Sequence, residues 1–317
     1  MIGAGRMGSH HCRIFSATDG VELVAVIDQN PNKAARLAAL HGCAAGHEPQ
    51  SLAGRVDAVS IAAPSALHGE IGGMMLEMGV SCLIEKPLAL TEVDCRRLIS
   101  LAEERGLILA VGHVERFNPA VVAAVAYLRG REILGIESRR LNPGSARILD
   151  NDVVSDLMVH DIDIVHHLLG TERTEVYARG IAPLQANLPD QVTAVLRFAP
   201  AGEGARLPVV VSLLASRITQ LRRRDMQILI PGGLVVVDFL TQTAEVMQPQ
   251  SAALGLASRI HSEFLPIRTV EPLTAEFHQF IAAVRGESTV VGATGRDALA
   301  ALRTVWAIQD SLRQGQK

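Results

Sequence analysis

The first third of the chain alternates short apolar runs with stretches whose apolar positions have helical spacing. The apolar runs are rich in Val and Ile, which favour strands, and the stretches between them are rich in Ala and charged residues. Strands that alternate with helices in this way are typical of βαβ units and a parallel sheet. The predicted strands are Val21–Asp28, Val56–Ala63, Val80–Ile84 and Leu107–Gly112, and the predicted helices are Lys33–His41, His68–Met78 and Glu92–Arg105.

The pattern changes after Asn118-Pro119, where strand-like segments follow one another with few helices between them. Such a sequence predicts an α+β domain with a largely antiparallel, open sheet that helices cover on one face. We therefore expect two domains, residues 1–118 and 119–317. The predicted strands are Glu132–Leu141, Thr174–Ile181, Gln191–Phe198, Leu207–Ser216 and Asp225–Phe239, with a hairpin at Gly232-Gly233, and the predicted helices are Val153–Leu169, Pro272–Arg285 and Arg296–Arg313.

Composition narrows the class of protein. Hydrophobic residues make up 48% of the chain and aromatic residues 3%, so a large core is built mainly from aliphatic side chains. A formal charge of −3 argues against a nucleic-acid binder. No apolar run of membrane-spanning length and no signal peptide is visible, and the four cysteines have no CxxC spacing. We expect a cytoplasmic protein with reduced thiols.

A glycine motif lies at the start of the chain. Gly3-Ala4-Gly5-Arg6-Met7-Gly8 matches G-x-G-x-x-G and opens a predicted helix, as in Rossmann dinucleotide-binding domains. There the glycines let the backbone approach a pyrophosphate, which the helix N-terminus binds through its N–H groups. Asp28 ends the next predicted strand, where a carboxylate accepts hydrogen bonds from ribose hydroxyls and repels a 2′-phosphate. Since no Arg follows it directly, the sequence predicts NAD rather than NADP.

Only Met1 and Ile2 precede Gly3, whereas the first strand of this fold normally runs several residues along the centre of the sheet. We therefore expect the given chain start to be truncated, with an apolar stretch encoded upstream.

Two further positions carry candidate chemistry. Glu85-Lys86-Pro87 follows an apolar strand, at the end of a parallel sheet where ligands gather, and the Lys86 ammonium can donate to a substrate hydroxyl. Asp156 and His160 have i, i+4 spacing in a predicted helix and so share a face. A carboxylate beside an imidazole orients it and suits it to act as a general base.

In this order and at these intervals, Gly3-x-Gly5-x-x-Gly8, Glu85-Lys86-Pro87 and Asp156-x-x-x-His160 resemble the Gfo/Idh/MocA oxidoreductase family. The resemblance covers essentially the whole chain. It implies an NAD-dependent dehydrogenase in which Lys86 and His160 are the catalytic pair and Asp156 tunes His160. It also implies cofactor contacts at Pro64, His68, Glu85 and Lys86, although His68 can equally be an ordinary residue at a helix start.

Two longer strings, Val111–Pro119 and Asp156–Val165, resemble a branch of the family that oxidises the 3-hydroxyl of UDP-N-acetylglucosamine. In that branch an aminotransferase then installs an amine, and the product feeds lipid A biosynthesis. The resemblance implies that Arg116, Asn118 and Arg147 bind substrate together with Lys86 and His160. Arginines suit a diphosphate because they bind it with paired hydrogen bonds, and further candidates are Arg139, Arg140 and Arg222–Arg224.

Other interpretations remain open. A family enzyme acting on inositol or a free sugar has no diphosphate to bind, and a non-catalytic NAD-sensing protein has no need of a base. His160, Asp163 and His167 have a spacing that suits a metal, but hydride transfer to NAD needs none and the family implies none. The uncovered sheet face predicts a homo-oligomer, a dimer or tetramer.

Overall fold

The computed structural model describes residues 1–143, 152–171, 173–184, 188–250 and 260–315. The chain divides into two compact units. Unit 1 comprises Met1–Val114 and Glu271–Leu299, and unit 2 comprises Glu115–Val270 and Ala300–Lys317. The chain therefore returns to the first unit after leaving it, which the single boundary predicted at residue 118 does not describe.

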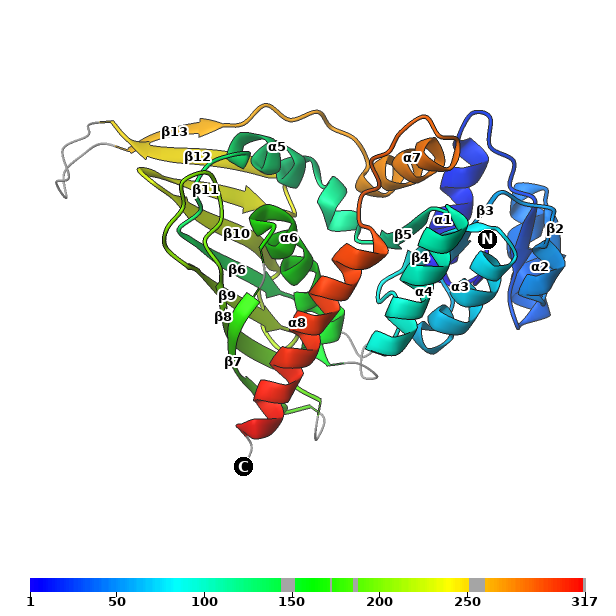
Figure 1. Cartoon of the computed structure of the whole chain (residues 1–317), viewed down its shortest axis with the longest axis horizontal. Helices are drawn as coiled ribbons and strands as arrows, with labels where there is room; N and C mark the ends of the chain where they lie inside the picture. Colours follow the sequence, from blue (N-terminus) through cyan, green and yellow to red (C-terminus); the bar gives the residue numbers. More distant parts are fainter. Residues whose placement is uncertain (144–151, 172, 185–187, 251–259, 316–317) are drawn as a thin grey trace. The chain divides into compact units, whose positions relative to one another are not determined.

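Unit 1 contains the predicted parallel strands with helices between them (Figure 1). One three-stranded parallel sheet has the order β3-β4-β5, and β1 pairs with β2, also in parallel. The strands are β1 (Ala25–Ile27), β2 (Ala44–Gly46), β3 (Ala58–Ile61), β4 (Ser81–Glu85) and β5 (Leu109–Gly112). The helices are α1 (Arg6–Ala17), α2 (Pro31–His41), α3 (His68–Glu77), α4 (Glu92–Arg105) and α7 (Pro272–Val284), with short 3₁₀ turns at Pro49–Leu52, Ser65–Leu67 and Val114–Phe117.

Ile2 joins the two small sheets. It forms parallel bridges to Ile27 of β1 and to Ile61 of β3. Its N–H donates to Ser60 O at 2.9 Å, and its carbonyl accepts from Ala62 N at 2.8 Å. Ile2 thus lies at the central place of the sheet, where the sequence leads us to expect a longer first strand. The upstream stretch stays a prediction.

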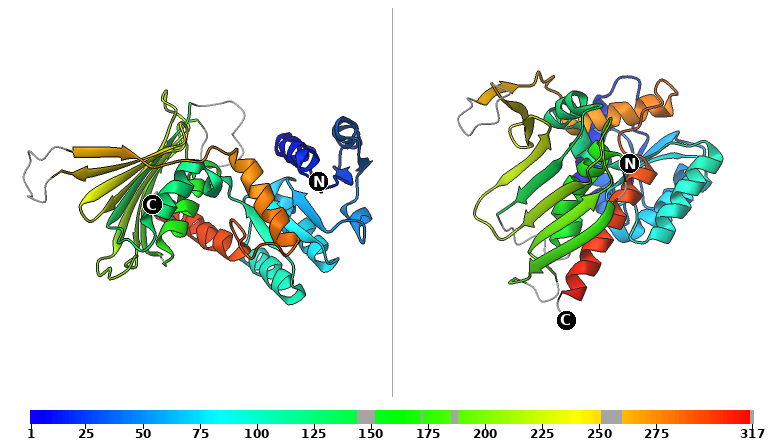
Figure 2. Two further views of the ribbon diagram at one scale, coloured as in Figure 1. Left: turned by 90° about the horizontal axis from the view of Figure 1, so that it is seen from above. Right: turned by 60° about the vertical axis from the view of Figure 1, so that its left-hand side comes forward.

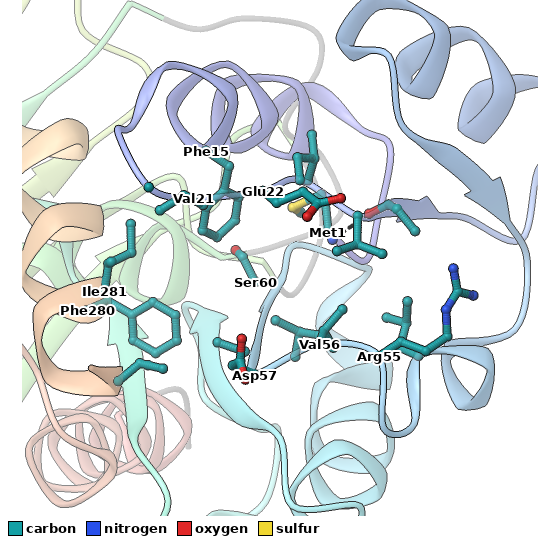
Figure 3. A pocket seen from close by; sticks show the side chains of 18 of the residues that line it. Met1, Phe15, Val21, Glu22, Arg55, Val56, Asp57, Ser60, Phe280 and Ile281 are labelled. Carbon is teal, nitrogen blue, oxygen red and sulfur yellow. Dashed lines mark hydrogen bonds between the residues drawn. The ribbon is translucent and has the colours of Figure 1, made fainter. Parts of the chain in front are cut away.

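A cavity of about 530 Å³ lies at the amino ends of β1 and β3 (Figure 3). Residues 21–25 and 56–60 line it, together with Phe15 of α1 and Phe280 of α7. The buried Met1 amino group donates to Ala25 O at 2.9 Å, and burial lowers the pKa of this amine to about 6. Ligands of open parallel sheets bind beyond the carboxyl ends of the strands, so this cavity lies at the opposite end from the expected cofactor site.

The described residues of unit 2 include an eight-stranded sheet with the order β13-β12-β11-β10-β6-β9-β8-β7. Only the neighbours β6 and β9 are parallel, so the largely antiparallel sheet predicted from the sequence is confirmed. The strands are β6 (Gly135–Leu141), β7 (Arg173–Ile181), β8 (Gln191–Phe198), β9 (Val209–Ser216), β10 (Arg223–Ile230), β11 (Gly233–Asp238), β12 (Thr243–Pro249) and β13 (Ile260–Phe264).

Helices α5 (Pro119–Leu128), α6 (Val159–Leu169) and α8 (Gly295–Gln314) lie against one face of this sheet (Figures 1 and 2). Their buried side chains share one apolar cluster with the inward residues of the strands, for example Phe198 and Val211. The strand residues between these point to the other face, where Val195 and Val210 are exposed. The expected one-sided covering is therefore confirmed for the described residues.

The structure adds elements that the sequence pattern did not predict. Helix α5 was missed because its sequence PAVVAAVAYL is apolar on every side and has no polar stripe. Strands β12 and β13 were also missed, whereas the hairpin predicted at Gly232-Gly233 is present: β10 and β11 pair antiparallel, and Gly232 between them has a φ of 70°. Within the described residues, no helix has both the length and the apolar character needed to span a membrane.

Candidate cofactor and active site

The three glycines of the first loop are required for three different reasons. Gly3 has φ of 98°, and a Cβ there would lie 2.5 Å from Ala62 O. A Cβ on Gly8 would lie 1.8 Å from Gly3 O, so the helix can begin beside the loop only without a side chain. Around Gly5, by contrast, an added Cβ meets no atom within 4 Å. Gly5 therefore leaves open space, as the approach of a pyrophosphate to the backbone requires.

Helix α1 begins at Arg6, with Gly5 as an N-cap that makes no side-chain hydrogen bond. The first N–H groups of a helix have no partner within the helix and attract anions together with the helix dipole. The Arg6 and Met7 side chains on this first turn are exposed. The loop thus presents backbone donors beside the open space at Gly5.

Asp28 is fixed at the end of β1 by two backbone amides. Its Oδ2 accepts from Ala4 N at 2.7 Å, and its Oδ1 accepts from Asn30 N at 2.8 Å. Each carboxylate oxygen can accept more than one hydrogen bond. Asp28 can therefore receive ribose hydroxyls while it remains tied to the glycine loop.

A cavity of about 580 Å³ collects these groups at the carboxyl ends of β1 and β3. Gly3, Gly5, Asp28 and Pro64 all line it, which brings four predicted cofactor residues to one site. A neighbouring hollow of about 560 Å³ shares Gly5, Asn30 and Lys33 with it. That hollow is also lined by Arg6, a predicted cofactor residue of the glycine motif, and by Arg36, which the sequence did not single out.

His68 is buried and is the first residue of α3, as the second interpretation of this residue has it. Its ring is 1% exposed, with Nδ1 2.7 Å from Pro87 O and Nε2 2.9 Å from Ala63 O. Both ring nitrogens thus face backbone carbonyls of the loops that follow β4 and β3. A direct contact of the His68 side chain with cofactor stays a prediction.

Glu85 is the last residue of strand β4, and Lys86 follows it. The Glu85 carboxylate lies 3.1 Å from Nε2 of the buried His11, and its other oxygen accepts from Lys86 N at 3.2 Å. An added Cβ on Gly112 of β5 would lie 3.0 Å from this carboxylate. Glu85 is therefore held among protein groups, and Lys86 is partly exposed at the strand end.

In unit 2, Asp156 and His160 lie on consecutive turns of one helical segment. Asp156 is in a π-helical turn, Val154–Met158, and His160 is the second residue of α6. The sequence predicted one regular helix from Val153, but the helical segment begins with this wider turn. Single π-helical turns within helices are frequently found at functional sites. Both side chains are partly exposed.

The predicted substrate residues Arg116 and Asn118 make internal contacts. Arg116 is 7% exposed, and its Nε and Nη2 donate to Asp163 at 2.9 and 2.7 Å. Asn118 caps α5 by accepting from Ala120 N and donates to Phe239 O. Substrate contacts from these two residues stay a prediction, and Arg147 lies outside the described residues.

A buried cluster of charges lies next to His160 in the sequence. Asp161 accepts from Arg140 Nε at 2.9 Å, and Arg140 Nη1 donates to Glu115 at 2.9 Å. Arg224 lies opposite Arg140 in the sheet and is 26% exposed. Burial first, and then the charge of Arg140, lower the pKa of the Arg224 guanidinium. Arg139 and Arg223 are instead paired with Asp225 on the other face of the sheet.

Known proteins resemble both parts of the chain. Residues 1–113 match the oxidoreductase family with an NAD-binding Rossmann fold, and residues 133–232 match the GFO/IDH/MocA C-terminal domain. The chain belongs to the Gfo/Idh/MocA family of oxidoreductases. The family, the fold class and NAD as cofactor, all predicted from the sequence, are thereby confirmed.

Two similar proteins are dehydrogenases with named substrates. UDP-N-acetylglucosamine 3-dehydrogenase of Acidithiobacillus ferrooxidans is 33% identical over 95% of this chain and 93% of its own. A solved structure of that enzyme has a TM-score of 0.88, with 30% identity over 100% of this chain and 97% of its own. Inositol 2-dehydrogenase of Rhizobium meliloti is 26% identical over 95% of this chain and 92% of its own.

The residues of the cavity fit NAD. The open space at Gly5, the uncapped start of α1 and the fixed Asp28 carboxylate supply a phosphate site and a ribose site in the expected order along the chain. Among the described residues, no group of three or more His, Cys, Asp or Glu side chains is arranged to hold a metal ion.

Replacing Asp28 by Ser should relax the choice of cofactor. The Asp28 charge opposes a 2′-phosphate by about 1–4 kcal/mol at contact distance, and Lys33 and Arg36 already line the adjoining hollow. We expect Asp28→Ser to tighten NADP binding by about 10–10³-fold, as measured by calorimetry. Adding Arg36→Ala should remove part of this gain. Tighter binding of NADP than of NAD by the unaltered protein would contradict this interpretation of Asp28.

Proposed function

We propose that this protein oxidises the 3-hydroxyl of UDP-N-acetylglucosamine to the 3-keto sugar. The observation that carries the proposal is the similarity to UDP-N-acetylglucosamine 3-dehydrogenase of Acidithiobacillus ferrooxidans, which extends over nearly the full length of both chains. The inositol 2-dehydrogenase matches at lower identity over a similar length. Inositol is therefore the second candidate substrate.

Charge in unit 2 supports a diphosphate substrate. Arg224 is the partly exposed member of the charged cluster that includes Arg140 and Asp161. Its guanidinium is half desolvated and lies near another cation, so an incoming anion offsets both costs. Because Asp161 directly follows His160 in α6, a diphosphate at Arg224 and a sugar at His160 belong to one region of this unit.

The chemistry assigned to each residue follows from its type. His160 accepts the proton of the hydroxyl, and the Lys86 ammonium stabilises the negative charge that develops on the oxygen. Asp156 orients His160. NAD, when bound, accepts the hydride that leaves the carbon. The product is a ketone next to the acetamido carbon, a suitable substrate for an aminotransferase, and lipid A assembly is the pathway we propose for it.

Turnover with matched substrates tests the proposal. NADH absorbance should rise with UDP-N-acetylglucosamine and much more slowly with N-acetylglucosamine or myo-inositol. Arg224→Gln should raise the KM for the nucleotide sugar by about 10–100-fold, the loss expected for a charged hydrogen bond, with kcat little changed. Arg223→Gln is the control, since Arg223 is paired with Asp225. Equal turnover of free and UDP-linked sugar would exclude the nucleotide-sugar assignment, and faster turnover of inositol would establish the second candidate.

We also propose that the protein self-associates through the uncovered face of the unit 2 sheet. Val210 and Leu229 are 51% and 49% exposed on this face, and Tyr177 is 56% exposed. Apolar side chains gathered on one face usually mark an interface. Val210→Glu with Leu229→Glu should lower the mass measured by light scattering, whereas Val122→Glu, on the exposed side of α5, should leave it unchanged. A monomeric unaltered protein at micromolar concentration would contradict this proposal.

We propose a cytoplasmic location for this protein. All four cysteines are free thiols, as is usual in reducing compartments.

A further inference from the structure

Two buried histidines of unit 1 hold the residues on either side of Lys86. His68, the first residue of α3, contacts the residue after it: Nδ1 lies 2.7 Å from Pro87 O. Its Nε2 lies 2.9 Å from Ala63 O, in the loop that borders the cofactor cavity. Carbonyl oxygens only accept hydrogen bonds, so His68 donates to a carbonyl through a ring nitrogen that carries a proton. His68 therefore links the loop after β4 to the loop after β3.

His11 holds the residue before Lys86. It lies in α1, the helix that begins at the glycine loop, and its ring is 1% exposed. Nε2 is 3.1 Å from a Glu85 carboxylate oxygen, and Nδ1 is 2.8 Å from Ser60 Oγ of β3. A carboxylate only accepts hydrogen bonds, so the contact with Glu85 is favourable when Nε2 carries a proton, and the Ser60 hydroxyl can then donate to Nδ1.

Packing fixes the His11 ring itself. The Phe277 ring of α7 meets it edge-on with centroids 4.7 Å apart. The other Glu85 oxygen accepts from Lys86 N at 3.2 Å, so the contact continues to the backbone of Lys86. His11 thereby connects the start of the phosphate-binding helix to Lys86 through Glu85.

We propose that His11 and His68 are positioning residues that fix Lys86 relative to the cofactor loops. His11 contacts Glu85, the residue before Lys86, and His68 contacts Pro87, the residue after it. Each histidine also contacts a second segment of unit 1: His11 contacts Ser60 of β3, and His68 contacts Ala63, which lines the cofactor cavity. A lysine that stabilises a developing alkoxide must be placed to a fraction of an ångström, and a misplacement of about 1 Å costs on the order of 10²-fold in rate. This inference rests on the proposed role of Lys86.

Asparagine and glutamine substitutions separate the contacts of each ring. The amide nitrogen of Asn overlays Nδ1 of a histidine, and that of Gln overlays Nε2. At position 68, Asn keeps the donor to Pro87 and Gln keeps only the donor to Ala63. At position 11 the order is reversed: Gln keeps the donor to Glu85, and Asn keeps only the contact to Ser60.

The test compares these four variants for NADH formation from UDP-N-acetylglucosamine, with Lys86→Ala as a reference. We expect His68→Gln and His11→Asn to lower kcat by about 10–100-fold, with the Kd of NAD and the melting temperature within the range of the other two variants. His68→Asn and His11→Gln should retain most of the activity. Histidines that merely stabilise the fold would give no such crossed order, and its absence would overturn the proposal.

A second measurement needs no substrate. Deuterium uptake of the peptide spanning residues 82–90 should be faster in His68→Gln and His11→Asn than in His68→Asn and His11→Gln. The first two variants lose the side-chain contact to Pro87 or to Glu85, so the backbone amides around Lys86 open more often. Equal uptake in all four variants would contradict the inference. Unaltered turnover in Lys86→Ala would instead overturn the proposed function, while the uptake comparison would still decide how the segment is held.

Discussion

Lys86→Ala and His160→Ala should each remove most of the turnover while leaving NAD binding nearly unchanged. Neither residue lies in the glycine loop or at the ribose carboxylate Asp28. Loss of a general base typically lowers the rate by about 10²–10⁴-fold, and loss of a donor to a developing oxyanion by about 10²–10³-fold. Steady-state kinetics at saturating substrate, with calorimetry of NAD binding, measures both quantities.

Three related variants sharpen this prediction. The double variant should fall well short of additive loss, because both residues act on one proton transfer. Asp156→Asn should be milder, since it leaves both His160 and Lys86 in place. Lys86→Arg keeps the charge but replaces a compact ammonium with a planar fork, so little rescue is expected. Near-normal turnover in either alanine variant would show that the chemistry lies elsewhere.

The cofactor half of the site was predictable because its determinants are local. Gly3, Gly5 and Gly8 lie within six residues, and each is needed for a turn, an open space or a close contact that short-range geometry imposes. Asp28 follows from the length of one βα unit. The spacing of these residue types was therefore enough to predict the conformation of the glycine loop and the place of Asp28.

The contacts of unit 2 were less predictable because they join distant residues. Arg116 and Asp163 are 47 positions apart, and nothing near Arg116 in the sequence distinguishes a buried ion pair from a substrate contact. The return of Glu271–Leu299 to unit 1 depends likewise on packing such as that of Phe277 against Phe15. Apolar patterning predicts a helix there but does not specify which unit it packs against.

The same distinction applies to the two histidines beside Lys86. His68 follows Pro64 closely, so its place near the cofactor loop was predictable from the sequence. Its contact with Pro87 was not, since 19 residues separate the two. His11 resembles any residue on the inner face of α1 until its neighbours Ser60 and Glu85 are known. Its role depends on contacts between α1, which carries His11, and the strands β3 and β4.

Gly5→Ala and Gly8→Ala should have different effects: Gly5→Ala should weaken NAD binding alone, and Gly8→Ala should lower both NAD affinity and the melting temperature. An added methyl at Gly5 meets no protein atom within 4 Å, so Gly5→Ala should leave the melting temperature nearly unchanged. The methyl group occupies the space that we assign to the pyrophosphate, and the loss of close backbone hydrogen bonds to a charged group, at about 1.5–3 kcal/mol each, should weaken NAD binding by at least about 10²-fold.

Gly8→Ala is the contrasting variant. Its methyl group would lie 1.8 Å from Gly3 O, which no rotamer change can relieve because the obstacle is backbone. The start of α1 must then move away from the loop, so both the melting temperature and NAD affinity should fall. Calorimetry of NAD binding beside thermal unfolding distinguishes the two outcomes. If Gly5→Ala bound NAD as the unaltered protein does, the pyrophosphate would have to lie away from Gly5, and the open space there would need another explanation.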